Sequence, residues 1–249
     1  GTLDISGDLT VSNGAVFDIN GQSAVVGGNW NDAGGTFQAT GGGVLLGGGN
    51  TNITTGGSNY FSALTIFATG TKTAQSSLDI NGNFTINQGT FDINGQNADV
   101  SGNWNDASGT FQAAGGIVTL SGGNSDITTG GSNYFSALTV DATGTKTAQS
   151  DLDINGNFTL TAGTFAPGSN GVELAGNWSN SGTFTAGSGT VTFNGAGSQS
   201  LTPGSSSFYN LTTATSSTNV TLQADVTVTN DLTIGSSTTI DVGSNRAIT

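Results

Sequence analysis

The side chains able to support catalysis or metal binding in this chain are almost all carboxylates. The sequence has 16 Asp and Glu residues against three basic residues, Lys72, Lys146 and Arg246, and it contains no His and no Cys. Nucleophilic triads therefore lack their usual base, and thiolate metal sites lack their ligands. Two cooperating carboxylates, as in glycosidases, are the remaining route to hydrolysis.

The closest candidate pair of this kind is Asp151 and Asp153. One repeat earlier, Asp79 matches Asp153, but Ser77 stands in the place of Asp151. The three basic residues are also too scattered in the sequence to suggest the Lys or Arg site of a polysaccharide lyase. We therefore expect no enzymatic activity and no catalytic residue in this chain.

The sequence Asp-Ile-Asn-Gly occurs four times, beginning at Asp18, Asp79, Asp92 and Asp153. Its spacing of oxygen-bearing side chains is similar to the start of an EF-hand, but the Gly comes at position four rather than six and no bidentate Glu follows. The glycine-rich nonapeptide of calcium-binding β-rolls does not occur either. The motif favours an Asn-Gly turn preceded by an outward-facing Asp, with weak peripheral calcium binding as the alternative. We expect no metal site and no cofactor.

The overall charge narrows the possible partners. A formal net charge of −13 repels phosphate backbones and anionic membranes, so we expect no nucleic-acid binding and no membrane insertion. No apolar run reaches the length of a membrane span, and no signal peptide is present. Because the sequence lacks an initiator Met, we expect it to be a segment cut from a longer precursor.

The chain repeats itself at two intervals. Trp30, Trp104 and Trp178 recur at a constant interval of about 74 residues, and the segment Ser58–Thr85 returns almost unchanged at Ser132–Thr159. Within each copy there is a shorter period, because aligning Leu78–Phe91 with Ala98–Phe111 places Phe84 on Trp104 and Phe91 on Phe111. Four such segments in a repeat of about 74 residues average about 18.5 residues each, and such repetition is typical of solenoids.

Each short segment shows apolar residues alternating with polar ones, punctuated by Asn-Gly pairs, and no helical periodicity competes. Strands this short need neighbours above and below them. We therefore predict an all-β fold, a parallel β-solenoid (right-handed β-helix) with about 18–20 residues per coil and four coils per 74-residue repeat. About 13 coils, about 4.8 Å apart, would form one uncapped domain over residues 1–249, with about 3.4 copies of the repeat.

The segment Gly176–Thr213 carries the elements Gly-Asn-Trp, Gly-Thr-Phe and Gly-Thr-Val-Thr-Phe, which recur through the chain. In these elements the chain resembles the repeat regions of large bacterial surface proteins, of the filamentous-haemagglutinin-like and autotransporter-passenger kind. The resemblance implies extracellular or cell-surface display, as an adhesin stalk, shaft, fibre or sheath component. The amino-terminal secretion domain and the carboxy-terminal barrel or sorting domain of such proteins are not present in this sequence.

Two residue patterns offer binding alternatives on the same scaffold. Trp30, Trp104 and Trp178 form a sugar-binding platform if they point outwards, whereas the alternation favours a core position, with Trp104 packed on Phe84 after a turn at Gly102 and Asn103. The Thr-x-Thr pairs Thr71–Thr73 and Thr145–Thr147 would need to recur in successive coils to form an ice-binding array. A carbohydrate- or Ca2+-dependent binding module, with host or matrix glycans as partners, is therefore the alternative to a structural role.

The uncapped ends lead to a prediction about assembly. Solenoids normally carry atypical polar repeats that shield their terminal strands. The segment Leu3–Thr10 instead matches Leu78–Thr85, and Ile240–Thr249 ends inside another copy. We expect end-to-end stacking with further copies of the chain, or with further repeats of the parent protein.

Overall fold

The computed structural model describes residues 1–214 and 218–249, and in these residues the regular structure consists of β-strands alone. Strands β1 to β14 are β1 (Thr2–Ile5), β2 (Leu9–Thr10), β3 (Val16–Asp18), β4 (Ser23–Val26), β5 (Trp30–Asn31), β6 (Thr36–Gln38), β7 (Val44–Leu46), β8 (Thr51–Thr54), β9 (Leu64–Ala74), β10 (Leu78–Ile80), β11 (Phe84–Asp92), β12 (Ala98–Val100), β13 (Trp104–Asn105) and β14 (Thr110–Gln112). Strands β15 to β28 are β15 (Ile117–Leu120), β16 (Ser125–Thr128), β17 (Ala137–Ala148), β18 (Leu152–Ile154), β19 (Phe158–Ala166), β20 (Val172–Leu174), β21 (Trp178–Asn180), β22 (Thr183–Phe184), β23 (Thr190–Phe193), β24 (Gly197–Thr202), β25 (Asn210–Thr213), β26 (Thr218–Leu222), β27 (Leu232–Ile234) and β28 (Thr239–Asp241). Among the described residues, no helix is long and apolar enough to cross a membrane.

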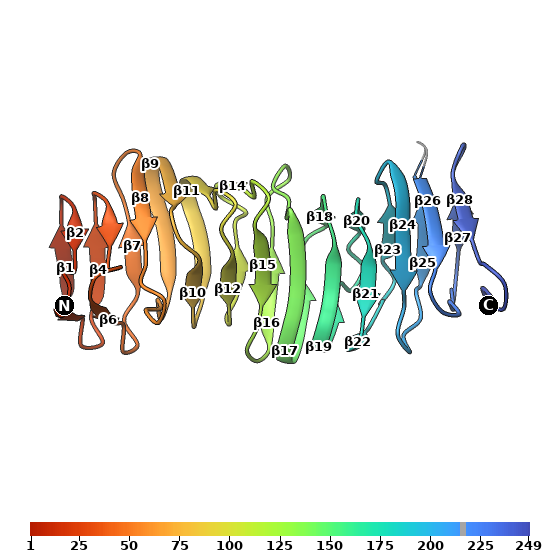
Figure 1. The fold of residues 1–249 in the computed structure, drawn as a ribbon, viewed down its shortest axis with the longest axis horizontal. Coiled ribbons are helices and arrows are strands. Elements are labelled where there is room, and N and C mark those ends of the chain that lie inside the picture. The colour runs from red at the N-terminus through yellow and green to blue at the C-terminus, as the bar shows by residue number, and fades with distance from the viewer. Residues whose placement is uncertain (215–217) are drawn as a thin grey trace. The chain divides into compact units, whose positions relative to one another are not determined.

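The strands pair in parallel with their counterparts one coil further along the chain. β1 pairs with β4, β2 with β5 and β3 with β6, so one coil contributes three short strands to three ladders. Figure 1 shows the strands following one another in chain order within each part of the molecule. The predicted all-β fold is confirmed: the chain forms a parallel β-solenoid of about 12 turns.

The register shows how the sequence repeat maps onto the coils. Leu3 begins a column that passes through Ala24, Val44, Leu64 and Phe84 to Trp104. Trp30 belongs to a different column, between Leu9 and Ile53. Trp30 and Trp104 therefore occupy different faces of the solenoid, because one sequence repeat does not make a whole number of coils.

The coils are accordingly somewhat longer than the average that the repeat suggested. The offset between paired residues varies from 19 for Lys72 and Phe91 to 23 for Trp30 and Ile53. The physical reason lies at the corners, where glycine-rich connections such as residues 47–50 add length without adding strand.

The core is a stack of apolar and aromatic side chains from successive coils. Trp104 is 1% exposed and its ring lies 4.6 Å from that of Phe84, measured between centroids. Phe91 and Phe111 are stacked with centroids 6.0 Å apart. This burial confirms the predicted core position of Trp104, whereas the bend before it lies at Ser101 and Gly102 rather than at Gly102 and Asn103. Offset and edge-to-face aromatic contacts of this kind add to the stability that burial provides.

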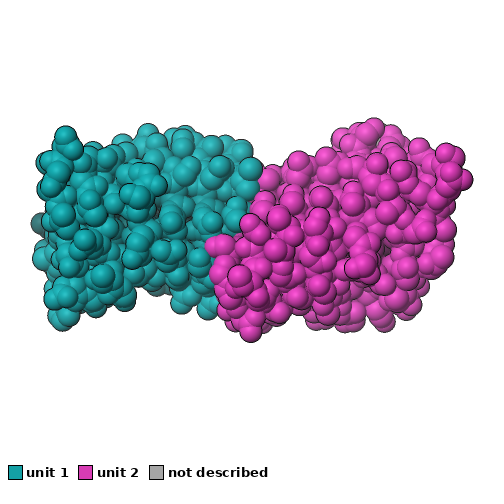
Figure 2. Space-filling model, turned by 60° about the horizontal axis from the view of Figure 1, so that its bottom comes forward, with its two compact units in different colours: residues 1–119, 130–133 teal, residues 120–129, 134–249 magenta. Residues whose placement is uncertain are grey.

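The chain comprises two compact units, shown in teal and magenta in Figure 2. The first contains residues 1–119 and 130–133, and the second contains residues 120–129 and 134–249. Each unit has parallel ladders and an aromatic column of its own. In the second unit this column includes Phe158 and Trp178, whose ring centroids are 4.5 Å apart.

Candidate functional site

The four Asp-Ile-Asn-Gly motifs adopt two different structures. At Asp18 and Asp92 the carboxylate accepts a hydrogen bond from the backbone N–H two residues later, at 2.7 and 2.8 Å. The following Asn20 and Asn94 have φ of 47° and 51°, a left-handed conformation that Asn tolerates better than most residues. These two motifs are turns, as the sequence suggested.

Asp79 and Asp153 lie instead within strands and face carboxylates on the next coil. Asp79 pairs in register with Asp99, and Asp153 pairs with Glu173. Burial and the charge of Asp99 raise the pKa of Asp79, and burial and the charge of Glu173 raise the pKa of Asp153. The structure therefore brings acidic residues together in pairs on the surface of the solenoid.

Neither pair is part of a larger cluster of metal-binding side chains in the described residues. Within residues 1–214 and 218–249, no group of three or more His, Cys, Asp or Glu side chains is placed to hold a metal ion. Asp151, the sequence neighbour of Asp153, accepts a hydrogen bond from the N–H of Gly171 at 2.7 Å. Its carboxylate thus links two coils.

Two further carboxylates, which sequence reasoning missed, are fully buried beneath tryptophans. Asp32 is 0% exposed and accepts hydrogen bonds from Trp30 Nε1 at 2.9 Å and from the N–H of Gly56 at 2.8 Å. Asn59 completes the arrangement: its Nδ2 donates to the carbonyls of Asp32 and Gly35, and its Oδ1 accepts from the N–H of Phe37. We call this set of Trp, Asp, Gly and Asn the clasp, because it ties one corner loop to the coil before it.

The second copy repeats the clasp with Trp104, Asp106, Gly130 and Asn133. Trp104 Nε1 donates to Asp106 at 2.9 Å, and the N–H of Gly130 donates to the same carboxylate at 2.8 Å. Burial raises the pKa of Asp106, while hydrogen bonds from Asn133, Trp104 and Gly130 act in the opposite direction. The available signal was Trp-x-Asp at identical positions in two copies, with Asn59 and Asn133 at matching positions further along.

The two lysines that the sequence left scattered also point into the core. Lys72 and Lys146 are 0% exposed. Lys72 Nζ donates to the carbonyl of Gly49 at 3.0 Å and to the hydroxyl of Thr51, and Lys146 Nζ donates to Ser125 Oγ at 2.7 Å. Burial lowers the pKa of Lys72.

Because the lysines point inwards, the threonines on either side of them lie on the outer face. Thr71 continues into a column with Thr90 and Thr110 on the next two coils. Its partner Thr73 is followed by Asp92 and Gln112 instead. A single threonine column is present here, but the Thr-x-Thr pair does not recur in successive coils.

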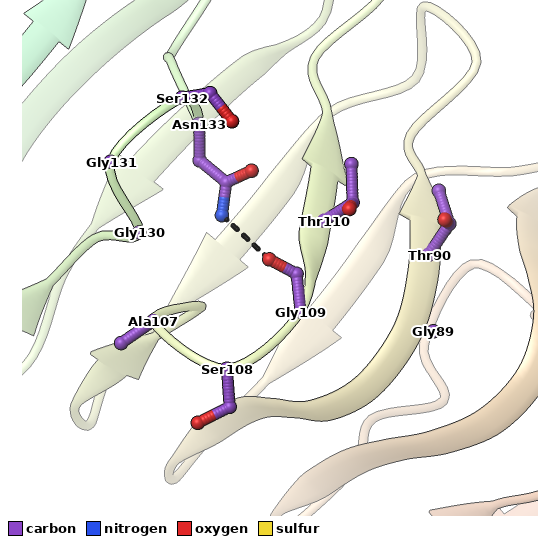
Figure 3. A pocket seen from close by; sticks show the side chains of 10 residues that line it. All are labelled: Gly89, Thr90, Ala107, Ser108, Gly109, Thr110, Gly130, Gly131, Ser132 and Asn133. Carbon is purple, nitrogen blue, oxygen red and sulfur yellow. Dashed lines mark hydrogen bonds between the residues drawn. The ribbon is translucent and has the colours of Figure 1, made fainter.

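A shallow hollow of about 460 Å3 lies beside this column, between the corner loops of the second clasp (Figure 3). Its rim carries the hydroxyls of Thr90, Ser108, Thr110 and Ser132, and no charged side chain lines it. Asn133 Nδ2 donates to the carbonyl of Gly109 at 3.0 Å across it. The hollow offers neutral hydrogen-bonding groups and no aromatic ring.

The three tryptophans do not form an external platform. Trp30, Trp104 and Trp178 are 1%, 1% and 0% exposed. Sugar stacking on these rings is therefore excluded in this conformation, and the core position that the alternation favoured is confirmed.

Comparison of the chain with known protein families, with curated proteins and with solved structures gives no match.

Proposed function

We propose that this chain is a structural solenoid that acts outside the cell or at the cell surface, as a shaft, fibre or sheath component or as an adhesin stalk, with no active site of its own. The observation that carries the proposal is the use of reactive side chains for coil-to-coil bonding. Buried Asp32, Asp106 and Lys72 each have hydrogen-bond partners one coil away. A segment with such a composition gains length by adding coils.

The proposal includes stacking onto a second copy through the uncovered strand edges. Leu3 is 42% exposed, although its register partner Ala24 is fully buried. At the opposite end, Ile234 is 52% exposed and its register partner Thr213 is 1% exposed. Both are inward-facing positions that a further coil would cover, supplied either by a second copy of the chain or by further repeats of the parent protein. An unpaired parallel strand with an open core section is a template for another strand of the same kind.

Light scattering on purified protein, with one variant for each edge, tests this assembly. Because head-to-tail stacking is heterologous, Leu3→Lys and Ile234→Lys should each abolish oligomers when present alone. An equimolar mixture of the two variants retains one intact edge of each kind and should form dimers and nothing larger. A wild-type protein that stays monomeric at high micromolar concentration would contradict the stacking proposal and leave the solenoid unaffected.

The cell-surface location has its own test. Antibody labelling of intact producing cells should detect the chain without permeabilisation. Labelling that requires permeabilisation would place the protein elsewhere.

A carbohydrate-binding module is the second candidate, and the neutral hollow beside Thr90 and Thr110 favours it. Hydroxyl and backbone groups of this kind can bind a neutral glycan without a charged partner. A glycan array probed with and without Ca2+ tests this alternative. Binding that is lost in Thr90→Val with Thr110→Val, in a protein of unchanged stability, would support it, and an array without signal would remove it.

A further inference from the structure

The third copy of the clasp consists of Trp178, Asn180, Pro203 and Ser206. We infer that it is a point of local opening, at which the corner loop Pro203–Ser207 detaches from the preceding coil while the rest of the unit stays folded. This goes beyond the proposed structural role and does not depend on it. It rests on a comparison between the third clasp and the two intact ones in the same chain.

The third clasp leaves its tryptophan without the bond that the others make. Trp30 and Trp104 each donate Nε1 to a buried carboxylate at 2.9 Å. Trp178 is 0% exposed, yet its Nε1 has no hydrogen-bond partner among the described residues. The corresponding acceptor, Asn180 Oδ1, is buried and also without a partner there.

A proline in the loop removes the backbone donor that the intact clasps use. In the intact clasps a glycine N–H, from Gly56 or Gly130, donates to the Asp carboxylate. Pro203 occupies this loop position in the third copy, and proline has no N–H to donate. Asn180 replaces the Asp, and its Nδ2 donates to the carbonyl of Pro203 at 2.8 Å. At this contact the side chain is therefore the donor, whereas the Asp of an intact clasp is the acceptor.

The asparagine that braces the intact loops is also lost. In the second copy Asn133 makes three hydrogen bonds, to the carbonyls of Asp106 and Gly109 and from the N–H of Phe111. Ser206 stands at this position in the third copy. It accepts from Phe184 N–H at 2.9 Å and from Asn180 Nδ2 at 3.2 Å.

These changes weaken the loop and leave the core beneath it intact. Hydrogen bonds to a buried carboxylate are stronger than those between neutral groups, and unsatisfied buried polar atoms favour the open state. The ring of Trp178 still packs on Phe158, with centroids 4.5 Å apart, and on Phe184 at 4.9 Å. Opening is therefore confined to the loop, as local unfolding reactions usually are.

The chain offers a direct measurement because it contains three tryptophans, one in each clasp. Proton–nitrogen correlation spectra should show three indole N–H signals, assigned with single Trp→Phe variants. In deuterated buffer, the Trp178 indole proton should exchange at least about tenfold faster than those of Trp30 and Trp104. Its proton shift should also lie upfield of theirs, since theirs are bonded to carboxylates.

A repaired variant provides the matched control. Asn180→Asp, Pro203→Gly and Ser206→Asn together give the third clasp the residues of the second, and the Trp178 proton should then exchange as slowly as that of Trp104. Should this triple variant fail to fold, Ser206→Asn alone should still slow the exchange. Equal exchange rates for all three protons in the wild-type protein would overturn the inference, and so would fast exchange of Trp178 that persists in a folded triple variant.

Discussion

Lys72 and Phe91 occupy paired positions on neighbouring coils, and both side chains are fully buried. A lysine therefore sits directly before the aromatic column that continues from Phe91 to Phe111. In the third copy the residues equivalent to Thr51 and Lys72 are Gln199 and Val220, which are again in register. Gln199 Nε2 donates to the carbonyls of Leu174 and Gly176, so one buried donor is present in either arrangement.

The first prediction is that the buried donor can come from either of the two neighbouring coils, and that losing it destabilises the protein. Lys72→Val should lower the free energy of unfolding by about 1–3 kcal/mol, because the carbonyl of Gly49 and the hydroxyl of Thr51 lose their donor. Adding Thr51→Gln, which copies the third repeat, should recover part of this loss. Urea unfolding monitored by circular dichroism measures both values. A double variant less stable than Lys72→Val would show that the two arrangements are not interchangeable.

The second prediction concerns the stacked carboxylates. The pKa of Asp79 is raised, so the folded state holds the proton of this carboxyl more tightly than the unfolded state does. The stability that this group contributes is therefore present below the ordinary pKa of 3.8 and is lost as the pH rises through the raised folded pKa. Asp99→Asn removes the like charge and should stabilise the protein at pH 7 by about 0.5 kcal/mol. The gain should vanish well below pH 3.8, where Asp79 is protonated and carries no charge for Asp99 to repel.

Asp4→Asn is the matched control for this pair, since Asp4 faces Val25 on the next coil. Thermal melts of the three proteins between pH 3 and pH 8 make the comparison. If Asp99→Asn and Asp4→Asn shift the melting temperature equally at every pH, repulsion between Asp79 and Asp99 is not the cause.

The third prediction concerns Trp104. Trp104→Ala should cost about 3–5 kcal/mol, as large aromatic-to-alanine changes in a core do, and it also removes a donor to buried Asp106. Phe67→Ala is the control, because this ring is 51% exposed and its loss should change stability by about 0.5 kcal/mol or less. Chemical denaturation gives both values, and an unchanged midpoint for Trp104→Ala would contradict the core assignment.

The fourth prediction concerns calcium. Isothermal titration should show no Ca2+ binding tighter than micromolar. Calcium prefers six to eight oxygen ligands, and within the described residues no group of three or more acidic side chains is placed to hold a metal ion. A chelator should leave the melting temperature unchanged. Tight binding that disappears in Asp79→Asn or Asp153→Asn would establish a site at the stacked pairs.

The repeating hydrophobic pattern was enough to predict the solenoid and several of its contacts. Aligning the chain with itself at the shorter period placed Phe84 on Trp104 and Phe91 on Phe111, and both pairs are in register. This worked because parallel coils superpose residues one period apart, so internal homology is also spatial proximity. The Asn-Gly pairs of the repeated motif likewise located the turns that follow Asp18 and Asp92.

The clasps and the buried lysines were not predicted. Alternation of apolar and polar residues indicates whether a side chain points inwards or outwards, but not which groups it contacts. Asp32 and Asp106 lie two residues after an inward tryptophan, and an acidic residue at such a position is ordinarily assigned to a turn. Their partners, Gly56 and Gly130, are 24 residues further on, across a corner whose geometry no periodicity describes. The average coil length taken from the repeat was likewise too short to give the coil count, since it ignored the variable corners.

The register of the repeat also limits multivalent binding through equivalent surfaces of the solenoid. Within the first unit, the column of Trp30 and the column of Trp104 lie on different faces, although the surrounding sequences are nearly the same. Two equivalent corner loops therefore cannot press against one flat surface together. Avidity depends on simultaneous engagement, so sequence repetition here does not provide multivalent contact with a planar target. Equivalent loops face different directions around the axis because a repeat of about 74 residues does not fill a whole number of coils of 19 to 23 residues.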